Sequence, residues 1–257
     1  MKIATGNYFI ILDSDCILPA NYLNNVHDSL SKYYVDCFGG PDAAHRSFSS
    51  LQKAINFAMT SFITTGGIRG KKSSVNKFQP RSFNMGLSKK AFNITNGFGR
   101  IHPGEDPDLS IRLWKLGFKT KLIPEAFVYH KRRISWSKFY DQVYKFGSVR
   151  PILNKWHPDT KKITYWFPSL FGIGVFLSII ALFFKVALPL YLVITYFVVC
   201  FIIAIIYTNS IVVALLSLVA IIIQFYGYGK GFLTSTIKLW FSKKNVEALF
   251  PNLFFKS

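Results

Sequence analysis

The sequence predicts an α/β domain followed by a C-terminal transmembrane helical region, and three observations support this fold class. Short apolar runs typical of strands alternate with helical patterns over the first 150 residues. One such run, residues 8–12, is followed directly by the acidic tripeptide Asp13-Ser14-Asp15. Beyond about residue 163, charged residues become sparse and long apolar runs begin. Alternating strands and helices favour a sheet covered by helices. Uncharged runs of about 20 residues match the thickness of a bilayer.

The first acidic motif lies at the predicted carboxyl end of the first strand. In open α/β sheets, ligands bind in the crevice outside the carboxyl ends of the strands. Asp13 and Asp15 are suited there to a hard cation such as Mg²⁺ or Mn²⁺, which takes one or two carboxylates together with substrate phosphates. The alternative is an Asx-type turn that begins the helix predicted after Asn21.

The stretch between the two acidic motifs predicts further elements of the same domain. Residues 38–42 form a strand and a tight loop, and residues 51–62 form an amphipathic helix that packs on the sheet or lies along a membrane surface. Residues 64–74 form a basic loop that covers an anionic donor or is simply solvated. Residues 81–88 return as a strand, and a short helix then ends at residues 96–99.

A second acidic motif, residues 104–109, begins another predicted helix. Pro107 suits the first turn and acidic side chains suit a helix N-terminus, so a structural role alone would explain the motif. Residues 117–130 then predict a turn, a short strand and a second strand that ends at His130. The basic residues Arg132 and Arg133 follow it.

Together these motifs resemble glycosyltransferase family 2, the inverting, metal-dependent transferases of the Rossmann-like GT-A fold. The resemblance rests on residues 6–15, on residues 104–109 with the turn at residues 117–118, and on residues 128–132. It covers roughly residues 4–150. It implies a nucleotide-sugar donor, a Mn²⁺ or Mg²⁺ cofactor and transfer of the sugar to an acceptor hydroxyl with inversion.

The resemblance also implies roles for the acidic residues. Asp13 would lie near the ribose of the nucleotide, and Asp15 would bind the metal on its diphosphate. Asp106 would be the general base, with Glu105 as the neighbour that orients it or replaces it in this role. We expect Asp108 to cap the helix.

Five more residues are candidates for the site. By resemblance, His130 completes the metal or diphosphate site; the alternative is a buried histidine at a strand end. Arg132 and Arg133 either contact the phosphates, which a guanidinium fork matches well, or are membrane-proximal basic residues. Asn84 and Met85 are candidates for the acceptor side because their strand flanks the acceptor pocket in the family.

The chain departs from the family pattern in two places. Residues 142–151 predict an interfacial helix that ends before Pro151. They lack the Gln-x-x-Arg-Trp signature of processive members such as cellulose and hyaluronan synthases, so we expect transfer of single sugars. The nucleotide-binding strand and βα units of the family do not precede Tyr8. We expect either a start further upstream or a remnant that depends on a separate N-terminal fragment and has little activity alone.

The apolar runs at residues 165–184, 186–207 and 211–225 predict about three transmembrane helices. We therefore expect four regions, which are a partial catalytic domain (1–150), an interfacial linker (151–164), the transmembrane helices (165–228) and a basic tail (229–257). Basic residues between positions 131 and 162 favour a cytoplasmic catalytic part, as at a bacterial inner membrane. If three helices cross, the lysines after residue 229 would lie outside the cytoplasm. Either the positive-inside rule is then broken, or one apolar run is re-entrant, or an additional segment spans the membrane.

The net charge of +19 suits anionic lipid and an anionic nucleotide donor. The membrane helices argue against a nucleic-acid partner. Membrane anchorage favours a lipid-linked or envelope-polysaccharide acceptor. Two other functions stay open. One is a non-catalytic membrane-bound remnant, and the other is a metal-dependent phosphohydrolase of lipid-linked substrates, which shares the acidic residues.

Overall fold

A computed structural model describes residues 1, 3–66 and 78–255, so residues 67–74 of the predicted basic loop lie outside the described part. The chain forms two compact units. The first comprises residues 1–47, 67–131 and 254–257, and the second comprises residues 48–66 and 132–253. The second unit thus includes residues 132–150, which the sequence assigned to the catalytic domain.

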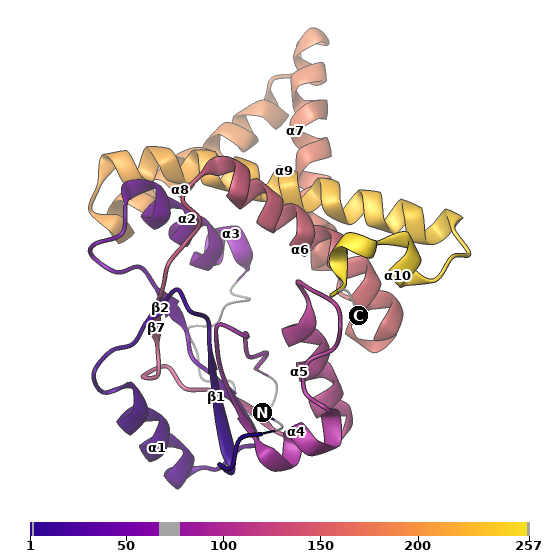
Figure 1. The fold of residues 1–257 in the computed structure, drawn as a ribbon. Coiled ribbons are helices and arrows are strands. Elements are labelled where there is room, and N and C mark those ends of the chain that lie inside the picture. The colour runs from indigo at the N-terminus through magenta and orange to yellow at the C-terminus, as the bar shows by residue number, and fades with distance from the viewer. Residues whose placement is uncertain (2, 67–77, 256–257) are drawn as a thin grey trace. The chain divides into compact units, whose positions relative to one another are not determined.

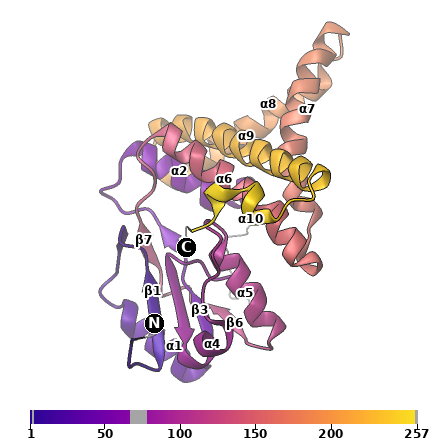
Figure 2. The same cartoon turned by 45° about the vertical axis from the view of Figure 1, so that its right-hand side comes forward.

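The first unit is built on a four-stranded mixed sheet with the order β1-β5-β3-β6. Figure 1 labels β1 of this sheet, and Figure 2 also labels β3 and β6. The strands are β1 (Tyr8–Leu12), β5 (Asn84–Ser88), β3 (Cys37–Gly39) and β6 (Thr120–Leu122). The central strand β5 runs antiparallel to β1 and β3, whereas β3 and β6 are parallel. A smaller sheet has the order β2-β7-β4, formed by β2 (Cys16–Ile17), β7 (Val128–His130) and β4 (Asp42–Ala43).

Helices cover both faces of the larger sheet because successive side chains of a strand point to opposite faces. On one face, Phe38 packs in a buried cluster with Tyr22 and Val26 of α1 (Tyr22–Lys32). On the other face, Cys37 packs in a cluster with Leu109 of α5 (Glu105–Lys115) and with Ala91 of α4 (Lys89–Thr95). This packing fixes the strand ends that carry the acidic motif and His130.

The second unit consists of helices. They are α2 (Ser50–Thr60), α3 (Phe62–Thr65), α6 (Trp136–Trp156), α7 (Phe167–Phe183), α8 (Leu188–Thr208), α9 (Ile211–Phe241) and α10 (Val246–Leu249). Three short 3-10 helices are η1 (Pro158–Thr160), η2 (Ile163–Trp166) and η3 (Pro251–Leu253). The core joins α2, α6, α8 and α9, and it includes Phe57, Phe139, Cys200 and Phe225.

The predicted fold class is confirmed, since a mixed α/β domain is followed by three long apolar helices. Within the described residues, the helices long and apolar enough to cross a membrane are residues 163–183, 188–208 and 211–241. Two predicted boundaries are wrong. Helix α6 continues through the buried Pro151 to Trp156, and α9 continues to Phe241 through much of the predicted tail. A proline inside a helix costs about 3 kcal/mol, and here α6 packs closely along α9, which outweighs that cost.

Candidate functional site

The pairing of β2 with β7 brings the first acidic motif to His130. The two strands are antiparallel, with Cys16 opposite His130 and Ile17 opposite Tyr129. The backbone N–H of Lys131 donates to the carbonyl of Asp15 over 3.2 Å. Asp15 and His130 are 115 positions apart in the sequence, and this register places them next to each other.

Two carboxylates and one imidazole converge at this point. Nε2 of His130 lies 3.3 Å from Oδ1 of Asp15 and 3.8 Å from Oδ2 of Asp13. The His130 ring stacks on Phe83, with centroids 4.6 Å apart, and this contact holds its orientation. Within the described residues, Oδ1 of Asp15 is buried and accepts no hydrogen bond. A buried acceptor beside a second carboxylate and an imidazole fits a cation ligand, because Mg²⁺ and Mn²⁺ take oxygen donors and Mn²⁺ also accepts imidazole.

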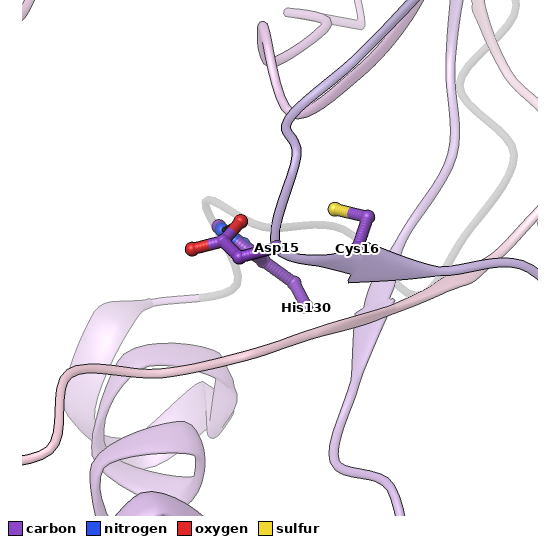
Figure 3. A group of neighbouring side chains, drawn as sticks. All are labelled: Asp15, Cys16 and His130. Atoms are coloured by element: carbon purple, nitrogen blue, oxygen red, sulfur yellow. Dashed lines mark ion pairs between the residues drawn. The ribbon is translucent and has the colours of Figure 1, made fainter.

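Cys16 is the neighbour of this group that sequence reasoning left out. Figure 3 shows the Asp15 carboxylate and the His130 ring together, with the Cys16 thiol further along β2. Ligand atoms of these three residues lie within 4.8 Å of one another. Burial, followed by the charges of Asp15 and Asp13, raises the pKa of the Cys16 thiol to about 12. The thiol is therefore neutral at physiological pH, and it donates to the carbonyl of Phe83 over 3.5 Å. The closely spaced donors are thus Asp15, Cys16 and His130, and Asp13 meets this group at His130 over 3.8 Å. Hard cations prefer oxygen donors to sulfur, and the cation-binding roles of Asp13, Asp15 and His130 stay predictions.

The second acidic motif forms the first turn of α5, as predicted. Oδ2 of Asp106 lies 3.5 Å from Nη1 of Arg81, and Oε2 of Glu105 lies 3.2 Å from Nδ1 of His102. Burial, and then the charge of Asp106, raises the pKa of Glu105. Both carboxylates are largely buried, with 13% and 12% of the side chain exposed. The motif therefore offers two acids in different surroundings, one beside an arginine and one beside a histidine.

The expectation that Asp108 caps α5 is wrong. The N-cap is Gly104, and Oδ2 of Asp108 instead accepts a 2.9 Å hydrogen bond from Nε of Arg112. Asp108 is the fourth residue of the helix, where the i, i+4 spacing directs it to Arg112.

One short segment touches both acidic motifs. The backbone N–H of Asp13 donates to the carbonyl of Phe83 over 3.3 Å, and Arg81 contacts Asp106. Arg81 and Asn84 form an isolated β-bridge at the start of β5. Residues 81–84 therefore connect the acidic motif at the end of β1 with the acidic residues of α5.

The comparison with known families decides the class of this site. The model of Glycosyl transferase family group 2 matches residues 8–209, which is most of the chain. The chain belongs to this glycosyltransferase family. A search of curated proteins finds no match. The matched residues of the transferase include the acidic motifs, His130, α7 and α8.

The two arginines after His130 lie in the second unit of the glycosyltransferase. Arg132 is buried, and its Nε and Nη2 donate to Oδ1 of Asn56 over 3.2 and 3.1 Å. Its carbonyl accepts a 3.0 Å hydrogen bond from Nε2 of Gln52. Arg133 is exposed. Their phosphate-binding roles stay predictions.

The acceptor-side candidates of the glycosyltransferase are fully buried in β5. Oδ1 of Asn84 accepts a 2.6 Å hydrogen bond from the Tyr22 hydroxyl, and its Nδ2 donates to the carbonyl of Ala126 over 2.8 Å. Met85 packs in the cluster with Leu109 of α5. In these contacts both residues support the sheet behind the site, and their acceptor-side role stays a prediction.

Sequence reasoning missed Arg81 and His102 as partners of the acids. Arg81 was noted only as the beginning of a strand, and His102 was not considered. For His102 a signal exists, because it precedes Glu105 by three residues and such a pair shares one side of a turn. Arg81 carries no comparable signal, since its contact with Asp106 spans 25 positions.

Proposed function

We propose that this family member transfers a sugar from a nucleotide-sugar donor to a hydroxyl of a lipid-linked or envelope-polysaccharide acceptor, with inversion and with a divalent cation. The observation that carries the proposal is the convergence of Asp13, Asp15 and His130 at the ends of β1 and β7. The family supplies the reaction class. This donor set fits the cation that such a reaction uses to neutralise a leaving diphosphate.

In the proposed reaction, the acceptor oxygen forms a bond to the anomeric carbon while the bond from that carbon to the diphosphate breaks. Asp106 takes the proton of the attacking hydroxyl, and a single base opposite the leaving group accounts for inversion. Arg81 orients the Asp106 carboxylate through their 3.5 Å contact. A bound Mn²⁺ or Mg²⁺ supplies Lewis-acid stabilisation of the diphosphate.

The remaining residues of the proposed site bind and orient the donor. Asp13 lies next to Asp15 and is assigned to the ribose side of the nucleotide. Glu105 positions Asp106 from the same turn of α5. Arg133 has an exposed side chain, and we keep it as a candidate for a charge-assisted contact with phosphate.

The proposed place of the reaction is the cytoplasmic face of a membrane, such as a bacterial inner membrane. Basic residues between positions 131 and 162 precede the first apolar helix, which is typical of a cytoplasmic segment. A lipid-linked acceptor would lie in the same membrane that the apolar helices of the chain enter.

The test uses the detergent-solubilised full chain, a panel of nucleotide-sugars and Mn²⁺. Mn²⁺ binding is measured by electron paramagnetic resonance, and release of nucleoside diphosphate is measured with and without a polyprenyl-phosphate acceptor. We expect Asp15→Ala to abolish Mn²⁺ binding and release, and Asp106→Asn to abolish release alone. Full turnover by Asp106→Asn contradicts the proposal. Release of free sugar or phosphate without acceptor favours the phosphohydrolase, and Mn²⁺ binding without any turnover favours the non-catalytic remnant.

A further inference from the structure

The C-terminal end of the described chain is bonded to the first unit. Phe254 forms a β-bridge with Ile101, and the N–H of Phe255 donates to the carbonyl of Arg100 over 2.9 Å. Nη2 of Arg100 donates to the carbonyl of Phe255 over 3.3 Å, and the ring of His102 stacks on that of Phe255. Residues 100–102 and 254–255 therefore lie on the same side of any membrane that the chain crosses.

Because Ile101 and Phe254 lie on the same side, the chain between them must cross the membrane an even number of times. Three crossings by α7, α8 and α9 would place Phe254 opposite Ile101, with a bilayer between them. Among the described residues, the segment after α9 holds only the short helices α10 and η3, neither long enough to return through a bilayer. One of the three apolar helices therefore does not cross.

Composition and burial single out α9. Within an apolar 18-residue stretch of each helix, the share buried inside the protein is 39% for α9, compared with 11% for α7 and for α8. Helices α7 and α8 contain no charged residue, whereas α9 contains Lys230 and Lys238. By length and composition α9 could cross a membrane as α7 and α8 could, so its greater burial and its two lysines distinguish it from them.

The neighbours of α9 hold it in a layer of helices within the second unit. Figures 1 and 2 show α9 lying across α7 and alongside α6. A Cβ on Gly231 would overlap the carbonyl of Tyr144, and one on Gly147 would overlap that of Tyr228, so the α6 and α9 backbones touch. Nε2 of Gln224, midway along α9, donates to the carbonyl of Thr64 over 3.5 Å.

The other face of α9 carries exposed and mostly apolar side chains from its beginning to its end. It carries Leu215, Ile222, Tyr226, Ile237 and Trp240, spaced so that they share one side of the helix. Nζ of Lys230 on this face lies 5.7 Å from the Tyr226 ring centre. An apolar face with aromatic residues and a long basic side chain suits the boundary between lipid headgroups and acyl chains.

We propose that α7 and α8 cross the membrane as a hairpin, and that α9 lies in the membrane surface with lipid against its exposed face, so that both ends of the described chain share one side. Lys243 and Lys244 then lie on the side of the basic residues 131–162, as the positive-inside rule requires. The short α7–α8 connection, with Lys185, lies on the other side.

The test is reaction of single cysteines with a membrane-impermeant maleimide in sealed inside-out and right-side-out vesicles. Cys16, Cys37 and Cys200 are first replaced, and one cysteine is then introduced as Lys32→Cys on α1, Val186→Cys between α7 and α8, or Lys243→Cys after α9. We expect Lys32→Cys and Lys243→Cys to react in one of the two vesicle orientations and to show only background reaction in the other. Val186→Cys should react in the orientation in which those two variants do not. Reaction of Lys243→Cys together with Val186→Cys overturns the proposal, and so does reaction of all three from one side.

The unmodified chain provides a second measurement that needs no substitution. Trypsin is added to the same two kinds of vesicle, and the fragments are identified by mass spectrometry. We expect cleavage after Lys243 or Lys244 from the side that also gives cleavage in the first unit. Cleavage at these two lysines only from the opposite side overturns the proposal. Neither maleimide labelling nor trypsin cleavage depends on sugar transfer. The proposed topology can therefore fail while the proposed function holds, and the reverse.

Discussion

The guanidinium Nη1 of Arg81 lies 3.5 Å from Oδ2 of Asp106. Arg81 also lies two residues before Phe83, whose carbonyl accepts the N–H of Asp13. One basic side chain thus connects the proposed general base to the strand that ends in the proposed cation ligands. A carboxylate held by such a contact loses orientational freedom, and misorientation of a catalytic group is costly in rate.

Removal of this arginine is expected to slow turnover without affecting the cation. Arg81→Ala should lower kcat by about 10- to 100-fold, since Asp106 loses the group that orients it. Mn²⁺ affinity should stay unchanged, and Arg81→Lys should recover part of the loss. Steady-state kinetics and Mn²⁺ titration measure both quantities. Lys119→Ala, which removes an exposed positive charge from the same unit, is the control. An equal fall in both variants would contradict the role given to Arg81.

The ligand set at the end of β1 predicts a contrast between two adjacent residues. Asp15→Ala should abolish Mn²⁺ binding, whereas Cys16→Ser should retain it, because a hard cation such as Mn²⁺ prefers oxygen ligands to sulfur. Mn²⁺ titration followed by electron paramagnetic resonance measures this contrast. Loss of binding in Cys16→Ser, in a variant that still unfolds at the wild-type temperature, would show that the sulfur is a ligand.

The contact between α6 and α9 predicts strong effects of added volume. Gly147→Leu or Gly231→Leu should destabilise the second unit by roughly 3 kcal/mol or more, because a side chain there must displace the facing backbone. A Cβ on Gly172 of α7 meets nothing within 4 Å, so Gly172→Leu is the matched control. Thermal unfolding in detergent, followed by intrinsic fluorescence, compares the three variants. Similar midpoints for all of them would exclude the close approach.

The hydrogen bonds of Asn84 predict a structural effect of its removal. Asn84→Ala should lower stability by about 1–3 kcal/mol, because the buried Tyr22 hydroxyl and Ala126 carbonyl lose a partner. Tyr22→Phe, which removes one of these bonds and leaves the shape of the ring, should lie between Asn84→Ala and wild type. If Asn84→Ala instead left the unfolding midpoint unchanged and raised KM for the acceptor, the acceptor-side prediction would be supported.

The surroundings of Glu105 predict a pH-dependent stability. Its folded-state pKa is raised, chiefly by burial, so the folded state holds the proton more tightly than the unfolded state. The associated stability is present below the unfolded value of about 4.5 and is lost as pH rises through the folded pKa. Glu105→Gln should therefore raise the melting temperature by about 2–4 °C at pH 7 and make little difference at pH 4.

The control for this prediction is Asp28→Asn on the exposed surface of α1. It should shift the melting temperature by a similar small amount at both values of pH. A gain from Glu105→Gln that is equally large at pH 4 would contradict the assignment to the buried charge.

Local patterns in the sequence were enough to predict several elements. The apolar run before Asp13, the acidic turn that begins α5 and the strand ending at His130 all follow from short-range periodicity and from residues typical of helix ends. The apolar helices follow from composition alone. The same reasoning misplaced the ends of α6 and α9, because packing between the two helices outweighs the local cost of Pro151 and of the glycines in α9.

The sequence by itself determined the α/β class, the acidic motifs and the apolar helices, since each depends on neighbours within a few turns or one strand. The tertiary structure alone decided which distant residues meet. The register of β2 on β7 places Asp15 next to His130. Arg81, just before β5, contacts Asp106 of α5, and Ile101 forms a β-bridge with Phe254. These pairings depend on strand register and on the packing of whole elements, and no local period of the chain encodes them.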